Sequence, residues 1–262
     1  MTTRKLFEQA IIKKSNKPNL NGYVMNNSEN LIEGVDVTLF QNDLNQGSGN
    51  ELKSKFNALY SSCALAVNNF AIVKKHMVDF SFLNYSDFYD ARFERQFNTG
   101  LGGTPPNLDF VIENKDTVIA FESKYLEPLV IKNVDFKASY NKVNLDYLDD
   151  FWFSLIEKYQ DNEFYLDIAQ LVKHSIGLIN YKRITNKNVI LVYIYWIPDN
   201  YDKYSEYIIH SNELNEFSKS LNNQNDLRFE SLTYNQFWVK YENSSLFKRH
   251  FENMRKRYKT EI

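Results

Sequence analysis

Two carboxylates and an amine lie close together in two neighbouring segments of the sequence. Asp109 follows Pro-Asn-Leu, and Glu122 and Lys124 flank a serine thirteen residues further on. Alternate residues of a strand point to one face, so Glu122 and Lys124 share a face if this segment is extended. Carboxylate oxygens suit Mg²⁺ or Mn²⁺, and a nearby lysine could orient or help to deprotonate a water. The pattern predicts metal-assisted hydrolysis of a phosphodiester.

The two segments are predicted to form a β-hairpin. A two-residue turn at Lys115-Asp116 pairs residue 112 with 119 and Asp109 with Glu122, whose Cβ atoms would lie roughly 4.5–5.5 Å apart. Like charges opposite each other destabilise a sheet, and a bound cation would offset that cost. The predicted ligands are Asp109, Glu122, the backbone carbonyl of Ser123 and waters.

A surface ion pair is the alternative explanation. Lys124 could pair with Asp109 or Glu122 on a solvated sheet face, where ion pairs contribute little stability. An isolated Asp…Glu-x-Lys favours that alternative, because short motifs often match by chance. The hairpin register and the flanking residues favour an active site.

Hydrophobic periodicity predicts the elements that position these residues. A loop and cap at 47–50 precede a long helix from Glu51 to about Val73. In a strand at 91–97, Phe93 and Phe97 face one way and Glu94 the other. Further strands are expected at 108–112, 118–125, 188–197 and 227–232, and helices at 146–160, 162–181, 203–222 and near the C-terminus. The apolar strand at 188–197 implies helices on both faces of a mixed sheet, an α/β sandwich.

The block Gly102–Asp109 together with Phe121–Pro128 resembles bacterial restriction-endonuclease-like proteins of the PD-(D/E)XK nuclease superfamily. In this chain Asn107 and Leu108 separate Pro106 from the acid, so the Pro-Asp dipeptide is absent. The resemblance implies a restriction-endonuclease-like sandwich and Mg²⁺- or Mn²⁺-dependent DNA cleavage in restriction or anti-phage defence. The resemblance covers roughly residues 47–200, the expected nuclease core. The polar, Asn-rich residues 1–46 are expected to form an N-terminal extension with little regular structure, and residues 201–262 an α/β continuation packed on the core.

An acidic residue upstream of the Asp often completes the metal site in nucleases that this chain resembles. Glu94 is the preferred candidate and Glu51 the alternative. Glu51 in the first turn of a helix would also complement the helix dipole, and Glu94 could simply pair with Arg92 in solvent.

The second helix after the hairpin carries polar residues at helical spacing. Gln170 and His174 are four residues apart and share a face. Related nucleases place such a face near the active site, which implies that Gln170, Lys173 and His174 contact the scissile phosphate or its neighbours. A polar face that is merely solvated explains the pattern equally well.

Basic residues gather near the C-terminus. Lys248, Arg255 and Lys259 could form one helical stripe that follows a phosphate backbone, or could complement a helix dipole. Lys13, Lys14 and Lys17 form a second cluster with the same two explanations. The predicted DNA-contacting residues are Lys248, Arg249, Arg255, Lys256, Arg257 and Lys259.

Composition limits the function classes. With 31 Lys+Arg, 33 Asp+Glu and a net charge of -2, the chain is not a non-specific polycation, but local charge can still bind nucleic acid. One cysteine excludes a disulfide scaffold and cysteine-ligated zinc. No apolar run approaches the ~18–20 residues of a membrane span and no secretory signal is visible, so a cytoplasmic location is expected.

The partners considered are DNA, a second copy in a homodimer and a cognate methyltransferase. The alternatives are a non-catalytic nucleic-acid- or protein-binding module on the same fold, and a nuclease for RNA or branched DNA.

Overall fold

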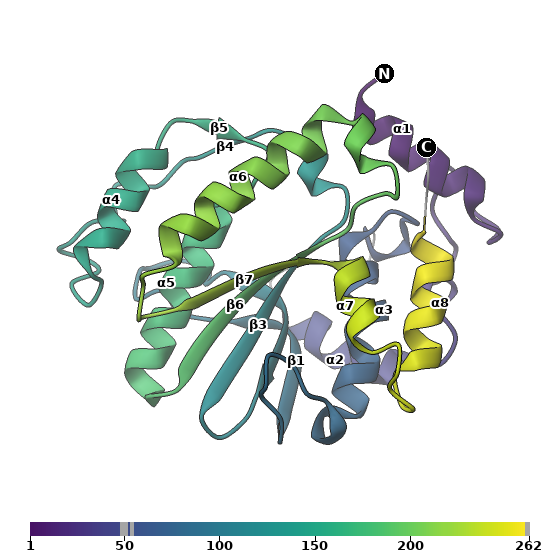
Figure 1. The fold of residues 1–262 in the computed structure, drawn as a ribbon, viewed down its shortest axis with the longest axis horizontal. Coiled ribbons are helices and arrows are strands. Elements are labelled where there is room, and N and C mark those ends of the chain that lie inside the picture. Colours follow the sequence, from purple (N-terminus) through teal and green to yellow (C-terminus); the bar gives the residue numbers. More distant parts are fainter. Residues whose placement is uncertain (48–51, 53–54, 260–262) are drawn as a thin grey trace.

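A five-stranded mixed sheet lies at the centre of the computed structural model (Figure 1), which describes residues 1–47, 52 and 55–259. The strand order is β1-β2-β3-β6-β7, with β1 to β3 antiparallel and β3, β6 and β7 parallel. The strands are β1 (Asp90–Gln96), β2 (Asn107–Glu113), β3 (Thr117–Lys124), β6 (Asn188–Tyr195) and β7 (Arg228–Thr233). The predicted mixed sheet flanked by helices is confirmed.

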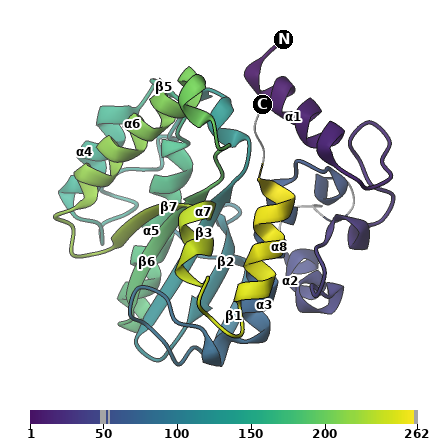
Figure 2. The ribbon, with the colours of Figure 1, turned by 45° about the vertical axis from the view of Figure 1, so that its right-hand side comes forward.

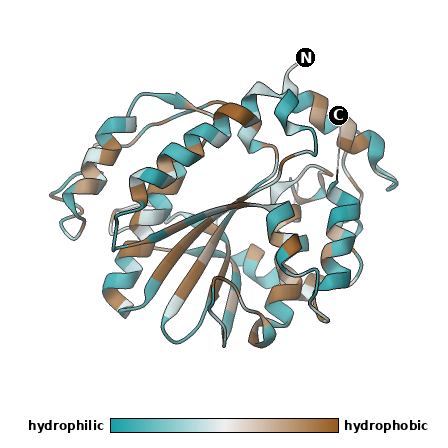
Figure 3. Cartoon of the chain, viewed as in Figure 1, coloured by the Kyte–Doolittle hydropathy of each residue, from teal (hydrophilic) through white to brown (hydrophobic). Residues whose placement is uncertain are grey.

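Helices cover both faces of this sheet (Figures 1 and 2). The first face carries α3 (Ser62–Lys75), α7 (Tyr234–Lys240) and α8 (Lys248–Tyr258), and the second carries α4 (Asp150–Tyr159), α5 (Ile168–Thr185) and α6 (Ser205–Leu221). Two separate hydrophobic clusters fill the two layers. The strands are apolar along most of their length (Figure 3). Every residue of β3 is buried, as expected for a strand covered on both sides.

The N-terminal 46 residues contain more regular structure than predicted. They form α1 (Thr3–Lys14), two 3₁₀ turns, η1 (Asn27–Asn30) and η2 (Val37–Leu39), and α2 (Gln41–Gln46). The expectation of little regular structure is therefore wrong. Phe7 and Phe40 are fully buried in the same cluster as α3 and α8, and this burial stabilises helices whose own sequence is polar.

The helix predicted from Glu51 begins later, at Ser62. The Ser61 side chain accepts a hydrogen bond from the Ala64 amide at 3.2 Å and caps it. Before that cap the chain forms the 3₁₀ turn η4 (Lys55–Asn57) and a β-bridge between Tyr23 and Ala58, so the helix cannot extend back through this segment. Glu51 and the predicted loop and cap at 48–50 lie outside the described residues.

Strand β1 does not keep the predicted alternation. Phe93 lies in the cluster under α3, but Phe97 lies in the cluster under α5. Between them Glu94 has a φ of 51°, in the left-handed region that strands do not use. This local change of conformation turns the end of β1 toward the other face.

The remaining short elements connect the main ones. They are η5 (Met77–Asp79), η6 (Glu127–Leu129), η7 (Tyr201–Lys203) and the two-stranded ribbon of β4 (Lys132–Asn133) with β5 (Glu163–Phe164). Across residues 1–47, 52 and 55–259, none of the helices combines the length and apolarity needed to span a bilayer.

Candidate active site

The β2–β3 hairpin has the predicted register. The Asn114 amide donates to the Thr117 carbonyl at 2.9 Å across the turn, and Ile112 pairs with Ile119. The ladder continues to Phe110 opposite Phe121. The next positions in this register are Asp109 and Glu122, so the open end of the hairpin brings the two acids together.

Asp109 is held by the backbone of the facing strand. Its Oδ2 accepts a hydrogen bond from the Ser123 amide at 2.6 Å. Burial raises the pKa of Asp109 well above its usual value, and the nearby carboxylates of Glu122 and Glu94 raise it further. Without a bound cation, the ionised form of Asp109 is therefore unfavourable.

Glu122 and Lys124 form a buried ion pair. The Lys124 Nζ lies 2.5 Å from Glu122 Oε1. Lys124 is 8% exposed and Glu122 is 2% exposed. This burial contradicts the alternative of a solvated surface pair. Burial alone would raise the pKa of Glu122, but Lys124 and His174 lower it to about 2. Although burial opposes the charge on Lys124, the neighbouring acids, led by Glu122, raise its pKa above the usual lysine value.

Helix α5 supplies the other wall of the site. Gln170 Oε1 accepts a hydrogen bond from Lys124 at 2.6 Å, and His174 Nε2 lies 3.0 Å from Glu122 Oε2. The Asp167 side chain caps the helix through the Gln170 amide, so the first turn is fixed where Gln170 meets Lys124. Gln170 and His174 therefore share a face toward the acids, as their spacing predicted.

Lys173 does not join this group. Its ammonium lies 3.4 Å from the Asp135 carbonyl and 5.5 Å from the centre of the Phe136 ring. It stands between Gln170 and His174 in sequence, but a one-residue step turns a helical side chain by about 100°. The predicted contact of Lys173 with the scissile phosphate is therefore not supported by its position.

Glu94 lies at the edge of the acid group. The Asn107 side-chain amide donates to Glu94 Oε2 at 2.9 Å, and Glu94 is close enough to raise the pKa of Asp109. Asn107, the residue that interrupts the usual Pro-Asp dipeptide, thus orients the preferred upstream acid. The competing candidate, Glu51, lies outside the described residues.

The donor set is compatible with a hard divalent cation, although the site is not closed around one. Within residues 1–47, 52 and 55–259, no three His, Cys, Asp or Glu side chains are grouped as a ready metal cage. The charges of Glu122 and Glu94 nevertheless act on Asp109, and a cation would offset the charge that raises its pKa. Carboxylates, a backbone carbonyl and water are the ligands that Mg²⁺ prefers.

Two tyrosines behind the site were not predicted. Tyr234 of α7 hydrogen-bonds the Ser123 hydroxyl at 2.6 Å, and Tyr193 of β6, opposite Glu122, hydrogen-bonds His210 at 2.8 Å. All of these side chains are buried. No local pattern could have indicated them, because Tyr234 is separated from Ser123 by 111 positions.

The C-terminal basic residues do not form one stripe. Lys248 and Arg255 line a cavity that also contains the acids Glu242 and Glu252. Arg249 pairs with Glu33 at 3.1 Å, and Lys259 pairs with Asp199 at 3.4 Å. Lys256 and Arg257 line a different cavity. The predicted DNA-contacting set is therefore split among several surfaces, because α8 turns its basic residues in different directions.

Comparison with known proteins identifies a family. A family model described as "Restriction Endonuclease associating with ARP" matches residues 6–259. No curated protein and no solved structure shows a significant match. The match includes α1 and α8 as well as the sheet, so it extends beyond the 47–200 core over which the motif resemblance was expected. The chain belongs to the family of restriction endonucleases associating with ARP.

Proposed function

We propose that this protein is a Mg²⁺- or Mn²⁺-dependent endonuclease of the PD-(D/E)XK type that hydrolyses DNA phosphodiester bonds in restriction or anti-phage defence. Membership of a restriction-endonuclease family supports the nuclease class. The observation that carries the proposal is the convergence of Asp109, Glu122 and Lys124 at the open end of one hairpin.

The metal would be held by Asp109, Glu122 and the Ser123 carbonyl, with Glu94 as a further acid. When bound, it would lower the pKa of a coordinated water and offset the charge that develops on the phosphate. The half-buried position of Asp109 and the hydrogen bond that it accepts from the Ser123 amide fix one ligand before the metal arrives. Such preorganisation lowers the cost of assembling the site.

Lys124 acts as a cation in this proposal. Its pKa is raised by the adjacent acids, so its ammonium is retained at neutral pH. A permanent ammonium orients a water and stabilises a phosphate, whereas a general base would need to lose a proton. Gln170 holds the lysine and His174 holds Glu122, so both are assigned as positioning residues.

The test is cleavage of plasmid DNA by the full chain with Mg²⁺ or Mn²⁺. Asp109→Asn, Glu122→Gln and Lys124→Ala should each abolish cleavage. Asp116→Asn, an exposed acid at the hairpin tip, is the matched control and should keep it. Folded protein that cleaves no DNA would contradict the proposal, and activity that survives Asp109→Asn and Lys124→Ala would contradict the site. RNA and branched DNA as parallel substrates distinguish the alternative nucleases.

A non-catalytic binding module on the same fold is the second candidate. It is favoured by one observation: both carboxylate oxygens of Glu122 already have a basic neighbour, Lys124 or His174. Titration calorimetry with Mn²⁺ separates the two. An endonuclease should bind Mn²⁺ more tightly than its Asp109→Asn/Glu122→Gln variant, and equal binding would favour the module.

The remaining expectations belong to the same proposal. A restriction enzyme would act in the cytoplasm beside a methyltransferase that protects host DNA, and a homodimer would cut both strands. An adjacent methyltransferase gene and a dimeric mass in solution would support these partners.

A further inference from the structure

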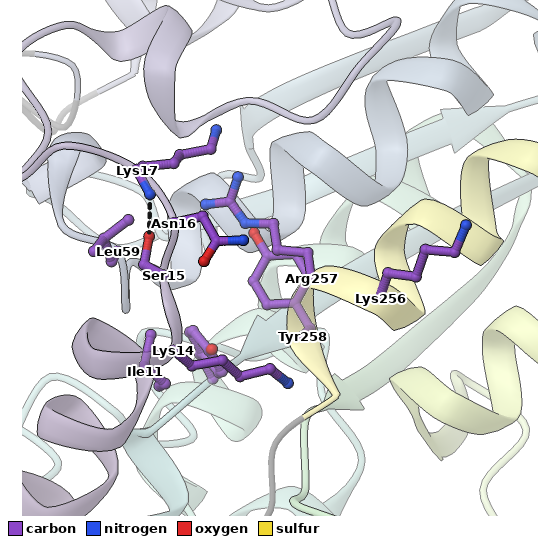
Figure 4. Close-up of a pocket in the computed structure, with 10 residues that line it drawn as sticks. Ile11, Lys14, Ser15, Asn16, Lys17, Leu59, Lys256, Arg257 and Tyr258 are labelled. Atoms are coloured by element: carbon purple, nitrogen blue, oxygen red, sulfur yellow. Dashed lines mark hydrogen bonds between the residues drawn. The ribbon is translucent and has the colours of Figure 1, made fainter.

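Two basic clusters that are far apart in the sequence meet in one pocket. Figure 4 shows Lys14 and Lys17, at and beyond the end of α1, on one side, and Lys256 and Arg257 of α8 on the other. The cavity has a volume of about 250 Å³. The other lining residues are uncharged: Ile11, Ser15, Asn16, Leu59, Tyr125 and Tyr258. The described lining therefore includes four basic residues and no acidic one, with the Lys256 amine directed away from the other three in Figure 4.

Helix dipoles do not account for the whole cluster. Lys14 and Lys256 lie in the last turns of their helices, where a cation is favourable. Lys17 lies beyond α1 and donates to the carbonyls of Glu29 and Leu31. These two acceptors are neutral, while the Glu29 carboxylate, whose charge raises the pKa of Lys17, accepts hydrogen bonds from the Met25 amide and the Asn26 side chain.

Among the described residues, Arg257 donates its side-chain hydrogen bond to an amide oxygen and not to a carboxylate. Its Nη2 donates to the Asn30 side chain, and its Nη1 is buried with no hydrogen-bond partner among the described residues. Burial and the nearby charge of Arg257 lower the pKa of Lys17 to about 8. The Glu29 carboxylate, which favours the charge on Lys17, lies outside the pocket lining, so an anion bound inside the pocket would further offset the repulsion between the two cations.

We propose that this pocket binds a phosphate group, carried either by a free nucleotide or by a DNA strand. Arginine and lysine recognise phosphate oxygens by charge-assisted hydrogen bonds, and Arg257 has an unused N–H for this purpose. The rings of Tyr125 and Tyr258 and the apolar Ile11 and Leu59 suit a sugar or base attached to the phosphate. The volume lies just below the ~300–1,000 Å³ of drug-sized pockets, which favours a small group such as one nucleotide.

One residue that lines the pocket, Tyr125, is the next residue in the chain after Lys124 of the candidate active site. Its ring packs edge-on against Tyr258 with centroids 5.6 Å apart. A bound phosphate group would thus contact the residue next to the lysine of the acid group. The proposal does not depend on catalysis, and it is tested without metal.

The test is binding to the full chain in EDTA, which separates its failure from failure of the nuclease proposal. The probes are inorganic phosphate, AMP and a short DNA duplex, measured by calorimetry or anisotropy. Lys14→Gln/Lys256→Gln removes two exposed pocket cations. Lys75→Gln/Lys219→Gln is the matched control, because these exposed residues carry the same charge in the last turns of α3 and α6, outside the pocket lining.

The pocket variant should bind at least one probe about tenfold more weakly than the control, as expected for lost charge-assisted contacts. Weakened phosphate and AMP binding would identify a nucleotide site, and weakened DNA binding alone would identify a DNA phosphate. Arg257→Gln should have the same effect. Pocket and control variants that bind all three probes equally would overturn the proposal.

Discussion

The two ends of the β2–β3 hairpin each carry a buried glutamate with two basic neighbours, but the open end also holds Asp109, whose pKa is raised. At the turn end, Glu113 contacts Arg95 at 2.5 Å, Lys187, and the Tyr181 hydroxyl at 3.1 Å. At the open end, Glu122 contacts Lys124 and His174, and the charges of Glu122 and Glu94 act on Asp109.

This difference separates a structural network from a candidate site. Two cations contact Glu113, and its pKa is lowered because the hydrogen bonds and charges of Lys187 and Arg95 outweigh its burial. At the open end Lys124 and His174 likewise lower the pKa of Glu122, but the pKa of Asp109 is raised by its burial and by the nearby Glu122 and Glu94. A carboxylate whose surroundings disfavour its ionised form is costly for folding. Such a residue is expected where function, and not stability, selects the residues.

The largest expected effect is the difference between two variants, each of which removes one lysine at one end of the hairpin. Lys124→Ala should reduce DNA cleavage by at least roughly 10²–10³-fold, to the background of the assay, because it removes a preorganised cation from the reacting phosphate. Lys187→Ala, at the turn end, should keep the cleavage rate per folded molecule. The measurement is plasmid cleavage normalised to the folded fraction. Equal loss in the two folded variants would remove the functional distinction between the ends.

The next effect is on stability. Glu113→Gln should lower the free energy of unfolding by about 2–3 kcal/mol, because it leaves Arg95 and Lys187 beside a neutral side chain. Urea unfolding checks this, with Asp116→Asn at the exposed turn as the control. A change no larger than that of the control would show that the Glu113 network is not structural.

The opposite sign is expected at the open end. In metal-free buffer, Asp109→Asn should raise the free energy of unfolding by about 1 kcal/mol, because it removes one of three crowded acids and keeps an oxygen for the Ser123 amide. Saturating Mn²⁺ should stabilise the wild type more than the variant. A variant less stable than wild type without metal would contradict the idea of a charge-strained site.

The smallest effect is a pH dependence at the turn end. The pKa of Glu113 is lowered in the folded protein, so its stabilising contribution is complete above the ordinary glutamate pKa of about 4.3 and is lost as pH falls further. The stability difference between wild type and Glu113→Gln should therefore be constant near neutral pH and shrink below about pH 4.3. Urea midpoints at several pH values measure it. A difference that grows on acidification would reverse the assigned sign.

The sequence predicted the local parts of the site well. The two-residue turn at Lys115-Asp116 fixes the register of β2 and β3, and a period of two then determines that Glu122 and Lys124 share a face. Helical spacing placed Gln170 and His174 together. These relations depend only on residues joined by one turn or one helix.

Other features depended on contacts that local patterns do not encode. The left-handed Glu94 breaks the alternation of β1, and Phe7 and Phe40 stabilise helices in a segment of polar composition. The start of α3 was misplaced because a β-bridge from Tyr23 occupies the preceding residues. In each case a distant part of the chain overrides the local periodicity.

The sequence by itself determined the hairpin, its paired acids and the lysine beside them, because turn geometry and strand periodicity are local. Only the tertiary structure decided what surrounds them: His174 on Glu122, Tyr234 on Ser123, and a buried ion pair in place of a solvated one. It also brought the basic ends of α1 and α8 into one pocket. Burial and the meeting of distant segments follow from the packing of the whole chain around two hydrophobic layers, and no short stretch of sequence contains that information.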